Sequence, residues 1–275
     1  MLIALAAALL AQLQPLPPQL VALDSPEGEK LLVESTARRA FFALVGQFAT
    51  QKSQAFCGVA SSAMVLNALP LAAPIAEEVA PFRAFTQDNV FSAEARPALT
   101  PEFVARGGLT VEQLTFLLRA NHADARPAYA KESSLEVFRA EASRALAAPN
   151  QYVLIDFSRG ELGQDTGAHW SPLAAYHAGS DRFLVLDVAR FRYPPYWVKA
   201  ADLFRAMETL DLDSGRSRGW VWVGPLAGAS PRVEIPSVQH RILRIVLGAG
   251  SAVFLAGALC GFLFARSRLR ARARG

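Results

Sequence analysis

The sequence predicts an α+β domain in which helices come first and an antiparallel sheet follows. Helix-start signals and apolar residues at helical spacing lie between residues 57 and 146, whereas short runs rich in branched and aromatic side chains lie between 152 and 223. Helices followed by strands is the order expected of an α+β arrangement. With 275 residues, 52% of them hydrophobic, the chain is long enough for one domain with a full core and for further segments at its ends.

The first predicted helix occupies an almost wholly apolar stretch from Val59 to Leu69, with Cys57-Gly58 at its N-terminus. Pro70 ends it, because the residue before a proline is biased away from the helical conformation. Three further helix starts carry capping residues, and the apolar faces behind them are interpreted as core. These starts are Thr100-Pro101-Glu102, Thr110-x-x-Gln113 and Ser133-x-x-Glu136.

Four short segments have the composition of strands. The residues from His177 to Asp181 separate the second segment from the third, so these two strands should form a hairpin. The sequence contains no internal repeat and no glycine-rich phosphate loop. The predicted strands are Tyr152–Phe157, Leu173–Tyr176, Phe183–Val188 and Trp220–Val223.

Residues 1–19 resemble a secretory signal that precedes the globular domain. Met1 to Ala11 is apolar and is followed by Gln-Leu-Gln-Pro-Leu-Pro-Pro, although no Lys or Arg precedes the apolar run. The alternative is a buried or frayed N-terminal helix. The globular domain is expected to extend over residues 20–224.

A membrane span is predicted near the C-terminus. Ile245 to Ala265 is a run of 21 residues without charge, long enough to cross roughly 30 Å of hydrocarbon as a helix. Residues 225–244 are interpreted as a linker and residues 266–275 as a basic tail. Five arginines follow the span and two precede it, which predicts a cytoplasmic C-terminus. The expected location is therefore the bacterial inner membrane, with the globular domain in the periplasm.

The charge of the chain does not indicate nucleic-acid binding by the globular domain. The formal net charge is +4, and without the five arginines of the tail it is −1. A tail that binds nucleic acid is the competing interpretation, but membrane topology explains these arginines. Because Cys260, one of two cysteines, lies in the predicted span, no disulfide framework is expected.

Cys57 is the first candidate for chemistry. At a helix N-terminus, unpaired backbone N–H groups and the positive end of the helix dipole would stabilise a thiolate and lower the pKa of the thiol. The alternative is structural, because free cysteine often behaves as a small buried hydrophobe. Gln51 lies six residues earlier, and its side-chain amide beside the backbone N–H of Cys57 would form a two-donor oxyanion hole.

His169 and Asp187 are candidate partners for Cys57. They flank the open ends of the predicted hairpin, and antiparallel pairing would bring these ends together although Asp187 lies eighteen positions after His169 in the chain. His169 would accept the thiol proton and return it to a leaving amine, while Asp187 would orient the imidazole. The alternative is a buried core histidine and a turn aspartate. His122 and His177 are interpreted as surface residues, and His240 lies beside the predicted span.

Three motifs together resemble phytochelatin synthase in its short bacterial form. They are Thr50-Gln51-x-x-x-Ala-Phe-Cys57-Gly-Val-Ala-Ser, Gly-x-His169-x-Ser-Pro-Leu-Ala-Ala-Tyr and Asp187-Val-Ala-Arg-Phe-Arg-Tyr-Pro-Pro-Tyr-Trp-Val198, and the likeness extends from about Leu23 to Val223. The resemblance implies that residues 20–224 are a catalytic domain with a papain-like cysteine protease fold. It also implies Cys-His-Asp chemistry and glutathione as substrate. Glycine would leave, and a γ-glutamylcysteinyl thioester would pass to a second glutathione or to water.

The resemblance also assigns residues. Cys57 would be the nucleophile, His169 the base, Asp187 the orienting acid and Gln51 the oxyanion donor. Substrate contacts are implied for Gly58, Asp156, Arg159 and Arg218, the alternative for the two arginines being solvated surface positions. Asp156 departs from the asparagine that bacterial relatives can carry, and the tryptophan-rich segment and cysteine-rich second half of the plant enzymes are missing.

The remaining expectations concern ligands and competing functions. No tightly bound cofactor and no metal site in the protein are expected, and Cd or Zn would enter only as a metal-glutathione thiolate. Expected partners are glutathione and the membrane, with a homodimer left open and no nucleic acid. The alternatives to a glutathione acyltransferase or hydrolase are a papain-like peptidase on other peptides and a membrane-anchored thiol or metal-binding module without turnover.

Overall fold

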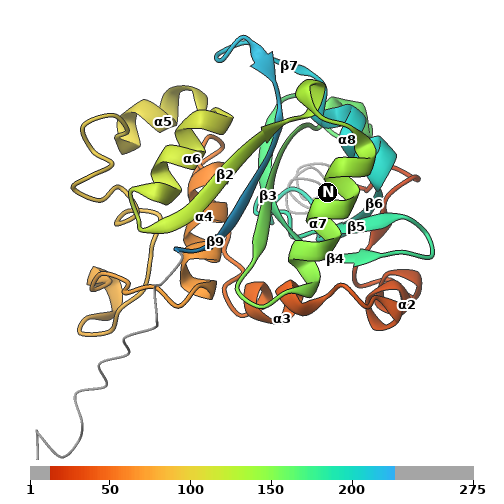
Figure 1. The fold of residues 1–275 in the computed structure, drawn as a ribbon, viewed down its shortest axis with the longest axis horizontal. Coiled ribbons are helices and arrows are strands. Elements are labelled where there is room, and N and C mark those ends of the chain that lie inside the picture. Colours follow the sequence, from red (N-terminus) through yellow and green to blue (C-terminus); the bar gives the residue numbers. More distant parts are fainter. Residues whose placement is uncertain (1–12, 227–275) are drawn as a thin grey trace, which may run out of the picture. The chain divides into compact units, whose positions relative to one another are not determined.

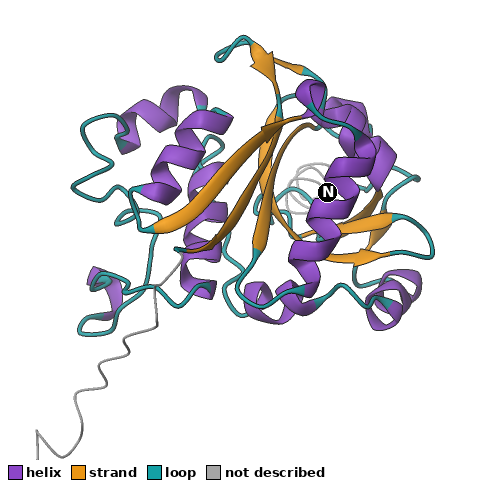
Figure 2. Ribbon diagram, viewed as in Figure 1, coloured by secondary structure: helices purple, strands orange, loops and turns teal. Residues whose placement is uncertain are grey.

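A computed structural model describes residues 13–226, which form a curved antiparallel sheet with helices on both faces (Figures 1 and 2). This arrangement confirms the predicted α+β class. The helices are α2 (Pro26–Glu34), α3 (Arg39–Val45), α4 (Cys57–Ala68), α5 (Pro101–Gly107), α6 (Val111–Arg119), α7 (Leu135–Ala147) and α8 (Ala200–Met207), with short 3-10 turns at Glu77–Val79, Ala130–Glu132 and Gly160–Leu162.

The main sheet has seven strands in the order β1-β6-β5-β4-β3-β9-β2, and every neighbouring pair is antiparallel. The last strand of the described residues, β9, therefore lies inside the sheet, between β3 and β2. A separate hairpin of β7 and β8 precedes β9. The strands are β1 (Val21–Ala22), β2 (Ala123–Tyr129), β3 (Tyr152–Ser158), β4 (Ala168–His177), β5 (Arg182–Val185), β6 (Tyr196–Lys199), β7 (Leu210–Asp211), β8 (Arg216–Ser217) and β9 (Gly219–Pro225).

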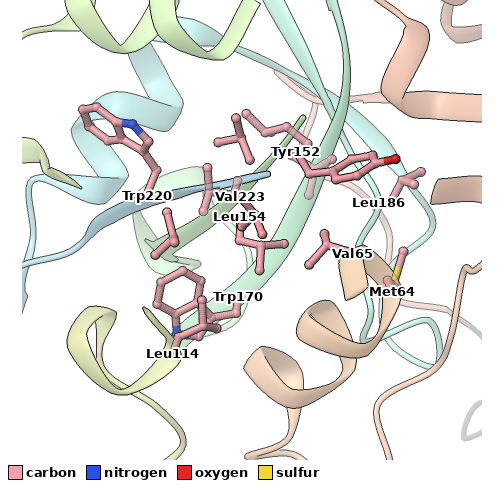
Figure 3. Close-up of a cluster of buried hydrophobic side chains, with 14 of the residues drawn as sticks. Met64, Val65, Leu114, Tyr152, Leu154, Trp170, Leu186, Trp220 and Val223 are labelled. Atoms are coloured by element: carbon pink, nitrogen blue, oxygen red, sulfur yellow. The ribbon is translucent and has the colours of Figure 1, made fainter. Parts of the chain in front are cut away.

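The core has two layers, one on each face of the sheet. On one face, Phe138 of α7 packs against Phe183 and Trp220, with ring centroids 5.1 and 5.0 Å away. On the other face, α4 and α6 place Met64, Val65 and Leu114 in the same buried cluster as Leu154 and Trp170 (Figure 3). Since side chains alternate between the faces of a strand, the sheet can bury apolar residues in both layers. The α4 layer is the one that carries Cys57.

The predicted helix starts were confirmed except for one residue. Helix α4 begins at Cys57 and ends at Ala68, and Thr100 caps α5 by accepting a hydrogen bond from the backbone N–H of Phe103. Thr110 and Gln113 form the reciprocal capping box. The box predicted at Ser133 is wrong by one position: Ser134 is the capping residue of α7, because its hydroxyl accepts the backbone N–H of Val137.

The four predicted strands are present, and their hairpin joins β4 to β5. The prediction missed three strands of the main sheet, β1, β2 and β6, and the separate β7–β8 hairpin. Strand β2 lies at the sheet edge and contains Pro127, which lacks a backbone N–H and is depleted in strands. Strand β6 is only four residues long and directly follows two prolines. The sequence therefore understated the width of the sheet.

Two of the terminal predictions lie outside the described residues. No helix within residues 13–226 is long and apolar enough to cross a membrane, while the predicted span at 245–265 and the tail at 266–275 fall beyond that range. Part of the predicted signal segment does lie on the domain. The backbone N–H of Gln14 donates to Arg192 O over 2.8 Å, and Gln19 Nε2 donates to Leu162 O over 2.7 Å.

Candidate active site

Cys57 is the first residue of α4 and is buried against strand β4. Its neighbour Gly58 has little free space, since a Cβ there would lie 3.0–3.3 Å from side-chain atoms of Leu109, Leu114 and Trp170. The indole of Trp170 donates to Leu109 O over 2.8 Å. This close packing explains why glycine follows the cysteine, and it sets the thiol beside the strand that carries the candidate base.

The pKa of the Cys57 thiol is shifted in the direction opposite to the expectation. Burial raises it from an ordinary value of 9.0 to about 11, and the charge of Asp156 raises it further, against the lowering effect of the backbone N–H groups of Trp170 and Gly58 and of the charge of Arg159. The helix-terminus argument was therefore incomplete. Backbone N–H groups do favour the thiolate, but at 6% exposure the loss of solvation is larger. In this structure the thiol is protonated at neutral pH.

His169 and Asp187 are brought together as the hairpin predicted. His169 is the second residue of strand β4, Asp187 follows β5, and His169 Nε2 lies 2.9 Å from Asp187 Oδ1. Ser171 Oγ is also 2.9 Å from this nitrogen. The described residues show no hydrogen bond between the Cys57 thiol and His169, and Nδ1 is the ring nitrogen left for that contact. Burial lowers the pKa of His169, with Asp187 opposing the shift, so the imidazole is neutral and can act as a base.

Asp187 is fully buried and accepts three hydrogen bonds on one oxygen. Besides His169, Arg159 Nη2 and the backbone N–H of Ala189 each lie 2.9 Å from Oδ1. Burial alone would raise the pKa of Asp187, but His169 and Arg159 together hold it below its usual range. The carboxylate therefore stays ionised and fixes the histidine ring in one orientation.

Arg159 is part of this buried network. It was predicted to bind substrate, but its guanidinium donates from Nη2 to Asp187 and from Nη1 to Gln164 Oε1 over 2.8 Å, and it lies 5.1 Å over the ring of Tyr193. A buried arginine with such partners is a positioning group for the Asp187 carboxylate. The solvated-surface alternative is wrong for Arg159, because only 2% of the residue is exposed.

Gln51 lies in the loop before α4, close to both halves of the site. Its backbone N–H donates to Val188 O over 3.0 Å, which ties this loop to the segment after Asp187. Its side-chain Nε2 donates to Ser53 O and Gln54 O over 2.7 and 3.1 Å, and Oε1 is buried without a partner. The amide that was assigned to the oxyanion hole is thus engaged by its own loop.

Asp156 and Arg218 form a second buried pair on the Cys57 side of the sheet. Arg218 Nη1 lies 3.3 and 3.2 Å from the two carboxylate oxygens of Asp156. Asp156 pairs in register with Trp170, and paired residues of neighbouring strands present their side chains to the same face. Burial raises the pKa of Asp156 to about 7, against the lowering effect of Arg218 and with a further increase from Asp211.

The other histidines are not in the site. His122 is exposed. The ring of His177 is hydrogen-bonded to Ser180 in the hairpin loop and lies 3.6 Å from the carboxylate of Glu34. His240 lies outside the described residues. Among residues 13–226 there is no group of three or more His, Cys, Asp or Glu side chains that could hold a metal ion.

The sequence did not reveal three supporting residues. Gln87 accepts the backbone N–H of Lys52 and donates to Thr50 O, both over 2.9 Å, and so holds the loop that carries Gln51. Gln164 accepts a hydrogen bond from the guanidinium of Arg159, and the charge of Asp211 raises the pKa of Asp156. Polar residues distant in sequence give no periodic signal, so only the folded structure shows these roles.

A helix-start cysteine beside a strand that carries a carboxylate-oriented imidazole defines a site for cysteine-dependent acyl transfer. Comparison with known proteins agrees with this class of site. A family model described as phytochelatin synthase matches residues 11–220, and the chain belongs to this family.

Several curated relatives are similar over most of this chain. Glutathione gamma-glutamylcysteinyltransferase 3 of Lotus japonicus is 31% identical over 237 residues, which are 85% of this chain and 48% of the relative. Glutathione gamma-glutamylcysteinyltransferase 1 of the same organism is 33% identical over 220 residues, 79% of this chain and 42% of the relative. Glutathione gamma-glutamylcysteinyltransferase of Schizosaccharomyces pombe is 29% identical over 218 residues, 77% of this chain and 50% of the relative. The chain thus spans about half the length of these relatives.

Proposed function

We propose that this chain is a glutathione γ-glutamylcysteinyltransferase, able to pass its acyl group to a second glutathione or to water. The observation that carries the proposal is the buried His169–Asp187 pair, whose histidine lies on β4, the strand that packs against the helix of Cys57. The names of its relatives support glutathione as donor. A helix that carries the nucleophile, set against a sheet that carries the base, also supports the papain-like comparison made from sequence.

In the first half-reaction, the Cys57 sulfur forms a bond to the carbonyl carbon of the cysteinyl-glycine peptide of glutathione. His169 accepts the thiol proton and delivers it to the leaving nitrogen as the C–N bond breaks, so that glycine departs and a thioester remains. In the second half-reaction, the α-amine of another glutathione or a water molecule attacks the thioester. His169 accepts its proton and returns it to the Cys57 sulfur. Asp187 stays ionised throughout and stabilises the charged imidazole.

The oxyanion of each tetrahedral intermediate needs two N–H donors. The backbone N–H of Cys57 at the start of α4 is one, and Gln51 Nε2 is the proposed second. Because Nε2 now donates to Ser53 O and Gln54 O, the developing charge would have to draw one of its two hydrogens away from these carbonyls. The loop carbonyls hold the amide in place until then.

Substrate binding is proposed for the Arg218 side of the site. Arg218 uses only Nη1 on Asp156, so its Nε and Nη2 edge is available to a carboxylate in the bidentate geometry that guanidinium favours. Gly58 is proposed to contact the substrate through its backbone, because side chains of Leu109, Leu114 and Trp170 fill the space beside its Cα. Cd or Zn would take part as a thiolate of glutathione and so arrive with the substrate.

Product analysis of the full chain with glutathione tests this function. We expect wild type to release free glycine, Cys57→Ala and His169→Ala to release none, and His177→Ala to behave as wild type because its histidine is remote. Added cadmium should increase γ-glutamylcysteine oligomers relative to free γ-glutamylcysteine. No glycine from wild type would refute the proposal. Turnover only of other peptides would favour a peptidase, and binding of glutathione or metal without any turnover would favour a binding module.

Attachment to the bacterial inner membrane, with the domain in the periplasm, is proposed from the sequence of residues 245–275 alone. Reporter fusions after Gly275 test it. Activity of a cytoplasmic reporter is expected, and activity of an extracytoplasmic reporter would overturn it.

A further inference from the structure

Two separate turns of the chain hold the carboxylate of Asp187. The first turn, residues 159–165, carries Arg159, whose guanidinium donates to Asp187 Oδ1 over 2.9 Å. The second turn, residues 187–192, carries Ala189, whose backbone N–H donates to the same oxygen over 2.9 Å. The position of the carboxylate, which orients the imidazole of the base, therefore depends on both turns.

Backbone hydrogen bonds close each turn, and an ion pair joins them. In the first turn, the N–H of Leu162 donates to Arg159 O over 3.0 Å. In the second, the N–H of Arg192 donates to Ala189 O over 2.7 Å. Arg192 Nε also lies 3.1 Å from Asp165 Oδ2, but the two side chains are 33% and 40% exposed, so solvent screens this pair and weakens it. A displacement of Leu162 or Arg192 would therefore move a donor to the carboxylate.

Residues 13–20, here called the N-terminal strap, bridge the two turns. At one end of the strap, the backbone N–H of Gln14 donates to Arg192 O in the second turn over 2.8 Å. At the other end, Gln19 Nε2 donates to Leu162 O in the first turn over 2.7 Å. The strap then continues directly into β1, which is fixed by its pairing with β6. It thus adds a second connection between the turns that hold the carboxylate.

The strap packs closely against the first turn. Gly163 has a φ of +70°, and a Cβ there would lie 3.1 Å from Gln19 Nε2 and 3.5 Å from Pro17 Cβ. Leu20, the last residue of the strap, is buried. Three of the eight strap residues are prolines, whose fixed φ reduces the conformational entropy that is lost when the strap is ordered. The strap is therefore suited to a fixed position on the domain.

We infer that the N-terminal strap positions the catalytic carboxylate, with Gln19 as its positioning side chain. By holding the two turns together, the strap keeps Asp187 aligned on His169. This inference rests on the proposed function, and it bears on the resemblance of residues 1–19 to a secretory signal. A cut before Gln14 leaves both hydrogen bonds of the strap in place, whereas a cut after Gln19 removes both and lowers turnover.

The test uses variants of the full chain. Gln19→Ala removes one hydrogen bond of the strap, and Gln14→Pro removes the other because proline has no N–H. Gln14→Ala is the matched control, since the Gln14 side chain is exposed and the backbone donor is kept. Deletion of residues 2–19 is compared with deletion of residues 2–12, which leaves the strap intact. Glycine release from glutathione gives kcat and KM, and hydrogen exchange is followed in peptides that cover the two turns.

We expect Gln19→Ala and Gln14→Pro each to lower kcat about three- to tenfold, as the loss of one hydrogen bond would give. KM should stay within about twofold, because the strap acts on the base and not on a substrate contact. Deletion of residues 2–19 should lower kcat at least about tenfold, since both bonds are lost. Gln14→Ala and deletion of residues 2–12 should match wild type. Hydrogen exchange in the first turn should be faster in Gln19→Ala.

A double-mutant cycle separates positioning from general support of the fold. In an Asp187→Ala background there is no carboxylate to align, so Gln19→Ala should have no further effect on the residual rate. The same fold-loss in both backgrounds, or a kcat of Gln19→Ala equal to that of wild type, overturns the inference. The single substitutions decide even if the deletion of residues 2–19 fails to fold.

Failure of the proposed function gives a different result. Absence of glycine release by wild type refutes that function, and hydrogen exchange then still tests the strap without any turnover. Unchanged exchange of residues 159–165 in Gln19→Ala would show that the strap does not hold the first turn.

Discussion

The protonated state of Cys57 can be tested directly by alkylation. The thiol pKa is about 11 instead of 9.0, and each unit changes the thiolate fraction tenfold. At a given pH below 9, the folded chain should therefore hold about a hundredfold less Cys57 thiolate than the unfolded chain. Since the thiolate is the reacting species, the alkylation rate of the folded chain should rise about tenfold per pH unit and show no plateau up to pH 9.5.

The assay treats the full chain with iodoacetamide between pH 6.5 and 9.5 and follows the peptide that contains Cys57 by mass spectrometry, which separates it from Cys260. Burial slows access equally at every pH, so the slope, not the absolute rate, is the diagnostic quantity. The same chain in urea provides the reference thiol. A plateau beginning below pH 7, lost in His169→Ala but kept in His177→Ala, would show a preformed thiolate-imidazolium pair and refute the argument from burial.

Three further predictions concern stability, measured by urea unfolding. Arg159→Met should cost about 3–5 kcal/mol, because it leaves the buried Asp187 carboxylate without its guanidinium; a cost below about 1 kcal/mol would contradict this. Asp156→Asn should stabilise the chain at pH 8 but not at pH 4. The folded pKa of Asp156 is about 7, so between pH 4 and 7 folded wild type retains a proton that the unfolded chain has lost. The stability of wild type therefore falls as pH rises from about 4 to 7, by at most about 4 kcal/mol. Equal effects at both pH values would contradict that reasoning. Gly28→Ala should destabilise by about 1–3 kcal/mol with the active site intact, because a Cβ there would overlap the carbonyl oxygen of Ala22 at the start of the sheet, whereas Gly46→Ala has room.

Much of the local structure around the site could be predicted from the sequence. Thr110 and Gln113 form their own capping box, and Pro70 ends α4 at the expected place, because these signals depend on neighbours in the chain. The nearness of His169 and Asp187 was also predictable, since a hairpin relates its two ends by simple pairing. Signals from neighbouring residues and from a single hairpin are therefore sufficient to predict these features.

The remainder depends on contacts between distant segments. The direction of the Cys57 pKa shift was wrong because the thiol is buried, and burial depends on contacts between distant segments, such as the packing of Leu109, Leu114 and Trp170 at the neighbouring Gly58. The partner of Arg159 could not be deduced either, because the sequence around an arginine does not show whether its side chain is solvated or paired with a buried carboxylate. Edge strand β2 was not predicted for a related reason. Its charged residues and proline are common in edge strands but rare in the central strands on which the composition rule is based.

The interior position of β9 has a consequence for biosynthesis. Strands β2 and β3 leave the ribosome well before β9, yet they are joined in the sheet only through it. Until residue 225 has been made, β2 lacks its only partner strand and the apolar surface under α6 lacks part of its cover. Sequential folding from the N-terminus is thus blocked at the middle of the sheet. The nascent chain must therefore be kept from aggregating until β9 can be inserted, and stop codons before Gly219 should yield insoluble products.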